Sequence, residues 1–225
     1  MQREPGLLPR ILSWLVAALV PVALTLSAVR LLLTPAFLQG EYRTPGFPPD
    51  PYGFTLEDRL RWALPTLAYL LNDADISFLA DLRLDDGTPL YNARELRHLE
   101  DTKRLVQGAL RVWSGAWIAL ALLGAWAWWG RWWREFRRGL ARGGWLTVAL
   151  LGLVILVALA SFGPLFVLFH RLFFEGDTWL FAYSDTLIRL FPMRFWRDAF
   201  VLAGALALAG ALALAWGAKP RRGQP

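Results

Sequence analysis

Residues 199–218 are AFVLAGALALAGALALAWGA, a run of consecutive positions without a charged side chain. A helix of about 20 apolar residues is long enough to cross the ~30 Å hydrocarbon layer of a bilayer. Three further runs have the same character: Ile11–Val29, which continues after Arg30 as apolar residues through Leu33, then Val112–Trp129 and Trp145–Phe169. This pattern predicts an all-α integral membrane protein with four transmembrane helices.

The composition of the 225-residue chain supports a membrane protein and excludes several other classes. Hydrophobic residues make up 56% of the chain, charged residues only 19%, and the mean hydropathy is +0.37. There is no cysteine, so disulfides, a thiolate nucleophile and cysteine-ligated metals are excluded. The chain also lacks the G-x-S-x-G hydrolase motif, a phosphate-binding loop and a dinucleotide fingerprint. Any acyl chemistry would therefore need a nucleophile supplied by the substrate.

The charges of the connecting segments predict the orientation, because Lys and Arg near span ends are retained on the cytoplasmic side. Segment 130–144 carries five Arg and one Glu, and the tail 219–225 adds Lys219, Arg221 and Arg222. By contrast, segment 34–104 carries 8 basic and 12 acidic residues, and segment 170–198 carries four of each. We therefore expect both termini to be cytoplasmic, and we interpret the net charge of +6 as a topology signal and not as a nucleic-acid site.

The expected order of segments follows from the spans and their charges. It is a cytoplasmic N-terminus (1–10), a first span (11–33), an extracytoplasmic cap (34–104), a second span (105–129), a cytoplasmic basic loop (130–144), a third span (145–169), an extracytoplasmic loop (170–198), a fourth span (199–218) and a cytoplasmic tail (219–225).

The cap is expected to be mostly helical. Its first part, 35–53, is rich in Pro and Gly and predicts an extended strap. Thr55 and Asp58 have capping-box spacing, and an apolar stripe follows over 56–71. Segment 76–84 fits either a short helix or a strand, and the Asp-Asp-Gly that follows it predicts a turn.

Two histidines, His98 and His170, are the candidate catalytic residues, because imidazole is the side chain best suited to proton transfer near neutral pH. The capping spacing of Asn92 and Glu95 predicts a helix that starts there and continues into the second span. On that helix, Glu95 and Asp101 lie one turn before and after His98, and either carboxylate could orient the ring. The alternative interpretation is that both histidines only place a polar ring tip at the lipid interface.

The depths of the two histidines do not match by simple counting. At about 1.5 Å per residue, His98 lies roughly 46 Å from Trp129, and His170 lies roughly 37 Å from Trp145. The difference requires helix tilt, a kink at Pro164 or a break near Gly108. A metal site of two His and a carboxylate would need ligands from separate segments, and no H-E-x-x-H spacing is present, so we expect no metal.

Two arginines, Arg30 and Arg111, lie near the outer ends of apolar spans. Both could place their charge at the interface by extending along the helix. Alternatively, one of them presents guanidinium donors to a carbonyl or headgroup oxygen of a substrate.

Three stretches stand out in the sequence: YNARELRHLEDTK (91–103), FHRLFF (169–174) with Trp179, and LIR (187–189) with Pro192. In these stretches the chain resembles a bacterial integral membrane family that includes the lipoprotein intramolecular transacylases. The resemblance implies an enzyme of the bacterial inner membrane that moves an acyl chain from the diacylglyceryl group of a lipoprotein to the α-amino group of its N-terminal cysteine.

If the resemblance extends to activity, His98 and His170 are the proton-transfer pair and Asp101 is the orienting carboxylate. The candidate substrate-binding residues are Arg30, Arg111, Glu95, Lys103 and Trp179. The expected partners are membrane lipid and the diacylglyceryl lipoprotein, with no cofactor and no nucleic acid. The alternative function is a non-catalytic membrane protein whose cap docks a partner through the apolar stripe at 56–71.

Overall fold

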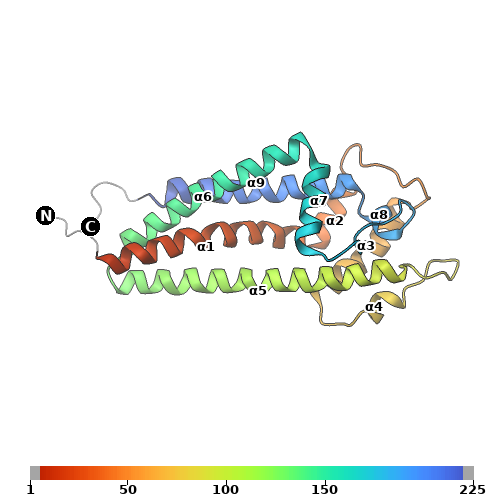
Figure 1. Cartoon of the computed structure of the whole chain (residues 1–225), viewed down its shortest axis with the longest axis horizontal. Helices are drawn as coiled ribbons and strands as arrows, with labels where there is room; N and C mark the ends of the chain where they lie inside the picture. The colour runs from red at the N-terminus through yellow and green to blue at the C-terminus, as the bar shows by residue number, and fades with distance from the viewer. Residues whose placement is uncertain (1–5, 220–225) are drawn as a thin grey trace. The chain divides into compact units, whose positions relative to one another are not determined.

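The computed structural model describes residues 6–219, and within them the structure is helical with one isolated bridge between Arg83 and Pro89. Arg221 and Arg222, which the charge argument used, lie outside the described residues. Figure 1 shows the helices, which are α1 (Leu7–Leu32), α2 (Pro35–Glu41), α3 (Leu56–Leu71), α4 (Ser77–Ala80), α5 (Ala93–Trp129), α6 (Trp133–Ala160), α7 (Phe162–Phe173), α8 (Thr186–Leu190) and α9 (Met193–Gly217).

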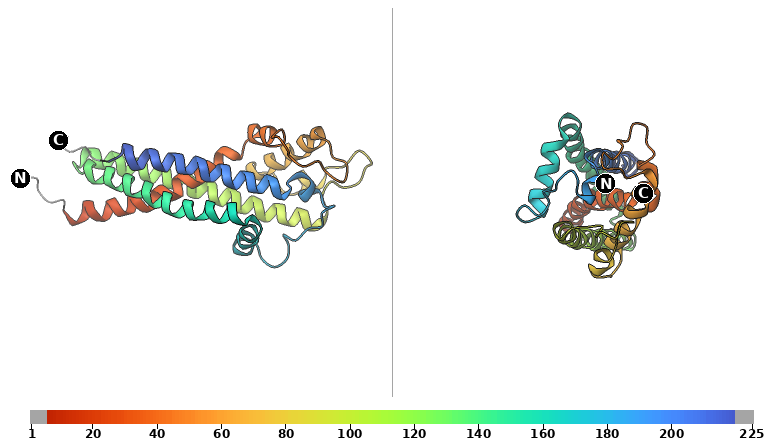
Figure 2. Two further views of the ribbon diagram at one scale, coloured as in Figure 1. Left: turned by 90° about the horizontal axis from the view of Figure 1, so that it is seen from above. Right: turned by 90° about the vertical axis from the view of Figure 1, so that its right-hand side faces the viewer.

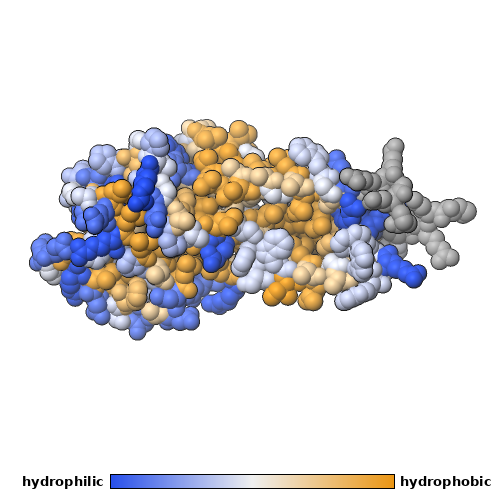
Figure 3. Space-filling view, turned by 180° about the vertical axis from the view of Figure 1, so that it is seen from behind, coloured by the Kyte–Doolittle hydropathy of each residue, from blue (hydrophilic) through white to orange (hydrophobic). Residues whose placement is uncertain are grey.

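The helices α1, α5, α6 and α9 are long and apolar enough to cross a membrane. Many of their large hydrophobic side chains are exposed, for example Leu122 and Leu153. Figure 3 shows hydrophobic residues spread over the exposed surface of these helices. Such a surface is stable in hydrocarbon and would be a liability in water. The chain is therefore an all-α, multi-pass membrane protein.

The chain forms two compact units, which we call the bundle unit (Met1–Val29, Leu110–Val157 and Val201–Pro225) and the cap unit (Arg30–Ala109 and Ala158–Phe200). In the bundle unit, the start of α1, the connection from α5 to α6 and the end of α9 lie at the same end (Figures 1 and 2). The basic segment that follows α5 is mostly helical, because α6 already begins at Trp133.

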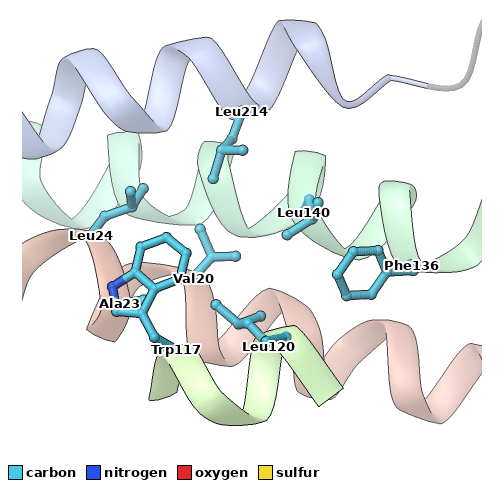
Figure 4. Close-up of a pocket in the computed structure, with 9 residues that line it drawn as sticks. Val20, Ala23, Leu24, Trp117, Leu120, Phe136, Leu140 and Leu214 are labelled. Atoms are coloured by element: carbon cyan, nitrogen blue, oxygen red, sulfur yellow. The ribbon is translucent and has the colours of Figure 1, made fainter. Parts of the chain in front are cut away.

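Glycines allow the helices of the bundle unit to approach closely. A Cβ at Gly143 would lie 2.5 Å from Cβ of Val20 on α1, and a Cβ at Gly144 would lie 2.6 Å from the carbonyl oxygen of Ala211 on α9. Neighbouring positions on α6 therefore contact two different helices, as small residues do in membrane bundles. The bundle unit also holds an apolar pocket of about 260 Å³ between its helices (Figure 4). No ionisable residue lines this pocket.

The cap unit has its own hydrophobic core, and its capping signals form as expected. Asp58 and Thr55 make a complete capping box at the start of α3. The middle of the apolar stripe is buried in the cap, with Ala63 at 0% and Leu67 at 7% exposure, while Leu56 and Leu71 at its ends are exposed. Within the described residues the middle of this stripe packs against the chain itself, which does not favour a docking surface over the whole of 56–71.

Two expectations for local structure differ from the fold. The strap at 35–53 begins with the helix α2, because Thr34 caps it and Pro35 occupies the first helical position, where no amide hydrogen is needed. The third apolar run is also not one helix, because α6 ends at Ala160 and α7 begins after Ser161. Pro164 lies in the first turn of α7, where backbone amides have no intrahelical acceptor, and so does not kink a continuous span.

Two further predictions agree with the fold. The Asp-Asp-Gly sequence forms a turn, in which Gly87 adopts a positive φ of 83° and its amide donates to the carbonyl of Leu84. The ambiguous segment before it contains the short helix α4 and then the isolated bridge of Arg83. The helix predicted near Asn92 continues without a break through Gly108 into the apolar part of α5.

Candidate active site

His98 is positioned by the start of α5. The Oδ1 atom of Asn92 accepts hydrogen bonds from the backbone amides of Arg94 and Glu95, both at 3.0 Å. The carboxylate of Glu95 in turn accepts from the Asn92 amide at 2.7 Å. This reciprocal capping fixes where the helix begins and therefore which face carries His98.

His170 is positioned by α7, and its orientation is set by a backbone group. Its Nδ1 atom lies 2.8 Å from the carbonyl oxygen of Phe166, one turn earlier. A carbonyl oxygen can only accept, so Nδ1 carries the proton in the neutral ring. The Nε2 atom then holds the lone pair, which makes His170 ready to accept a proton.

The two imidazoles face each other in the cap unit. Their ring centroids are 6.0 Å apart with an interplanar angle of 19°. The ring of Phe174 lies 4.6 Å from His98 and 5.3 Å from His170. Thus two histidines separated by more than seventy positions in the chain share one site, as the sequence predicted.

Aromatic side chains surround this pair, and we call them the aromatic enclosure (Phe166, Phe174, Trp179 and Phe181). The ring centroids of Trp179 and Phe166 lie 5.0 Å and 4.1 Å from that of His170. The ring centroid of Phe181 lies 5.3 Å from that of His98. His170 is only 8% exposed. Burial lowers the pKa of His170 below its usual value, while the hydrogen bond to Phe166 opposes this shift. His170 is therefore neutral at pH 7.

The segment that carries Trp179 and Phe181 is tied to the start of α5. Arg94 donates to the carbonyl of Leu180 at 3.0 Å, and the amide group of Asn92 donates to Asp185 at 3.2 Å. Asp185 also accepts from the backbone amide of Ala182 at 2.9 Å. These bonds close the aromatic enclosure over His98.

Asp101 does not orient His98. It pairs with Arg104 at 3.2 Å, one turn further along α5. The Nδ1 atom of His98 is buried and has no hydrogen-bond partner among the described residues. The expected role for Asp101 is therefore wrong in this structure, and packing against aromatic rings holds His98 instead.

Two of the candidate substrate-binding residues make internal contacts. Glu95 is 2% exposed, and its second oxygen accepts from the backbone amide of Leu187 at 2.8 Å. The ammonium of Lys103 donates to the carbonyl of Ala74 and lies 4.0 Å from the ring centroid of Tyr69. Both charged groups are already satisfied by the protein, so the structure assigns them to the scaffold.

The remaining candidates have different surroundings. Trp179 belongs to the aromatic enclosure, and its indole donates to the carbonyl of Gly176 at 3.1 Å. Arg30 donates to the carbonyl of Leu33 at 3.2 Å, at the end of α1. Arg111 is exposed on α5 in the bundle unit. Substrate binding by these residues stays a prediction.

Sequence reasoning missed the contribution of phenylalanine to the site. Phe166, Phe174 and Phe181 contact the imidazoles directly, and the Phe-rich stretch around His170 was the signal that could have indicated them. Within residues 6–219, no group of three or more His, Asp or Glu side chains could hold a metal ion. The site therefore offers a pair of bases in an apolar enclosure.

The fold and the site define the class of protein, a multi-pass helical membrane protein with two stacked imidazoles in an aromatic enclosure. A family model described as lipoprotein intramolecular transacylase Lit matches residues 12–196. Because this match covers most of the chain, the protein belongs to the Lit family.

Individual relatives agree with this membership. An uncharacterized protein of Aquifex aeolicus is 32% identical over 202 residues, which is 88% of each chain. The in meso structure of lipoprotein intramolecular transacylase Lit from Bacillus cereus is similar with a TM-score of 0.78 and 20% identity, over 93% of this chain and 94% of that one. A histidine-to-arginine variant of the Bacillus cereus protein is similar with a TM-score of 0.70 and 19% identity, over 92% and 88%. These two structures share the fold of this chain.

Proposed function

We propose that this chain is a transacylase that moves an acyl chain from the diacylglyceryl group of a lipoprotein to the α-amino group of its N-terminal cysteine, which yields the lyso-form lipoprotein. Family membership supports the reaction class. The observation that carries the proposal is the stacked pair of His98 and His170, with the Nε2 lone pair of His170 left free by the bond to Phe166.

The residues of the site match the requirements of this reaction. The substrate amine attacks the ester carbonyl, the new C–N bond forms, the ester C–O bond breaks, and the glycerol oxygen leaves as a hydroxyl. One proton must leave the nitrogen and one must reach the glycerol oxygen. His170 accepts the proton from the amine, and the pair returns it to the departing oxygen. The chain needs no nucleophile of its own, because amine and ester belong to the same molecule.

The aromatic enclosure favours transfer to the amine over hydrolysis. Water could attack the same ester and release a fatty acid. Phe174 contacts both imidazoles, and Phe181 and Trp179 cover them further. Apolar rings around the bases reduce the number of water molecules that can be activated, as closed sites do for reactive esters.

The proposed orientation places the cap unit outside the cytoplasm. The basic residues that follow α5 and the acidic balance of segment 34–104 support it. The lipoprotein substrate would then meet the histidines on the outer side of the inner membrane. A reporter fused after residue 225 should be active only when that reporter functions in the cytoplasm.

The experiment uses single substitutions in purified protein with a diacylglyceryl lipopeptide in vesicles. His98→Ala and His170→Ala should each abolish formation of the N-acylated lyso product, measured by mass spectrometry. Arg97→Ala is a matched control, because Arg97 is exposed on the same helix next to His98. Full conversion by both histidine variants would refute the proposal.

A further inference from the structure

The helix α7 has two apolar stripes: one packs against aromatic residues of α9, and the other is largely exposed. The first stripe contains Phe162, Phe166 and Phe169. Phe162 and Phe169 lie 5.5 and 5.7 Å from the ring of Phe200, and Phe166 lies 6.5 Å from the ring of Trp196. This stripe fixes α7 against the first turns of α9, and His170 lies beside it.

The second stripe contains Leu168 and Leu172, which are one turn apart. Leu168 is 54% exposed and Leu172 is 69% exposed. On a helical wheel both leucines lie about 160° from His170, while Leu168 lies about 100° and Leu172 about 60° from Phe169. Exposure of two large leucines on one face to water costs free energy, and the apolar face of a helix is normally buried against another part of the protein or against lipid.

The chain connection places α7 at the edge of the bilayer. Ser161 alone separates its first residue from the last residue of α6, which is one of the candidate membrane spans. Figures 1 and 2 show that α7 runs across the direction of the first turns of α5 and α9 within the cap unit. Since α5 and α9 are membrane spans, a helix across their direction lies parallel to the membrane plane.

We propose that α7 is an interfacial helix whose second stripe binds the acyl chains of the leaflet that borders the cap unit. Amphipathic helices of this kind bury an apolar face about 5–10 Å into the boundary between headgroups and acyl chains. Arg171 is exposed and lies about 100° around the helix from Leu172, a position from which its guanidinium can reach lipid phosphates. Leu168 and Leu172 alone offer far less area than the ~1,000 Å² that a stable protein interface needs, so the occupant is lipid and not a second copy of the chain.

This placement deepens the proposed function, on which the following consequence rests. His170 belongs to the same helix as Leu168 and Leu172, so it lies at the depth of the membrane interface. The ester bonds of a diacylglyceryl group occupy the same depth, where the acyl chains join the polar headgroup. The substrate therefore reaches the imidazole pair sideways from the leaflet, with its acyl chains still in the bilayer.

The test measures the depth of single positions with spin labels. The chain has no cysteine, so Leu168→Cys and Leu172→Cys each introduce a unique labelling site. Leu153→Cys is the control for a lipid-exposed position on α6, and Glu57→Cys is the control for an exposed position on α3. The protein is reconstituted in vesicles of phosphatidylethanolamine and phosphatidylglycerol, and relaxation by oxygen is compared with relaxation by a water-soluble nickel complex.

Labels at 168 and 172 should relax with oxygen as the label at 153 does, and the nickel complex should have a several-fold smaller effect than at 57. Nickel access equal to that at 57 would overturn the proposal, and so would dipolar broadening between labels, which would indicate a second copy. The measurement does not depend on activity. If the depth result fails while His98→Ala still abolishes product, only this inference is lost. If the histidine variants stay active while the depth result holds, the proposed function and the substrate path that rests on it are lost, and the interfacial placement of α7 stands.

Discussion

Replacement of Glu95 by alanine is the sharpest test of how the active site is held. The carboxylate of Glu95 is 2% exposed and accepts hydrogen bonds from the amides of Asn92 and Leu187. It thus connects the start of α5, which carries His98, to the start of α8. Alanine would leave the buried amide of Leu187 without an acceptor, which costs about 1–3 kcal/mol. It would also remove the capping bond to the part-buried amide of Asn92, which is worth about 0.5–2 kcal/mol.

The expected loss in the free energy of unfolding for Glu95→Ala is therefore about 1.5–5 kcal/mol. In a chain of this length, this corresponds to a fall of at least about 3 °C in the unfolding midpoint. Glu95→Gln keeps one acceptor oxygen and should lose about half as much. The assay is thermal unfolding in detergent, together with the rate of product formation at several substrate concentrations.

Glu100 offers a matched control on the same helix. Its ion pair with Arg104 is exposed, with side-chain exposures of 45% and 68%. Such a pair contributes at most about 0.5 kcal/mol, so Glu100→Ala should unfold at nearly the same temperature as the unmodified protein. If Glu95→Ala also unfolds at that temperature and only raises KM, Glu95 binds substrate and the structural assignment is refuted.

Three further predictions follow from the structure. Gly144→Ala should destabilise the bundle unit by about 1–3 kcal/mol, because its Cβ would lie 2.6 Å from the carbonyl oxygen of Ala211. The control is Gly152→Ala on the same helix, where a Cβ meets nothing within 4 Å. This control should be neutral or stabilising in the same unfolding assay. In imidazole NMR spectra, His170 should titrate below its usual pKa of 6.5. Between the lowered pKa and pH 6.5, the unfolded chain binds more protons than the folded chain does. The contribution of neutral His170 to the free energy of unfolding is therefore complete above pH 6.5 and is lost as the pH falls towards the lowered pKa. Lys103→Met should lower the unfolding midpoint without changing KM, because the ammonium holds the carbonyl of Ala74 and not the substrate.

Much of the fold could be predicted because local signals agree with the tertiary context. The capping spacings at Thr55 and Asn92 identified the starts of α3 and α5, since the bonds that cap a helix involve neighbours in the chain. The apolar runs predicted the membrane spans for a similar reason, because length and hydropathy are local properties. The error at Pro35 came from counting prolines without their position in the helix, where the first residue tolerates them.

The candidate site could be predicted only in part. The identity of the two histidines followed from their chemistry, and the structure confirms that they lie together. The group that orients His170 is a backbone carbonyl, which every residue has, so no residue type could have indicated it. Asp101 had the right spacing for a bond to His98, but it pairs with Arg104 at the same spacing on the same helix, and sequence alone does not rank the two.

The amino-acid sequence by itself determined that the chain crosses the membrane, where its helices begin and which side chains can move protons, because hydropathy, capping and pKa belong to individual residues and their near neighbours. The tertiary structure decided that the third apolar run breaks at Ser161 and that α7 turns across the direction of the first turns of α5 and α9 within the cap unit. That turn, rather than a kink at Pro164 or a break near Gly108, accompanies the meeting of His98 and His170. The physical reason is that an apolar run tends to continue as one helix unless many weak packing contacts favour a break. Here those contacts are made against the start of α9 by Phe162, Phe166 and Phe169, and they allow two rings from distant segments to meet.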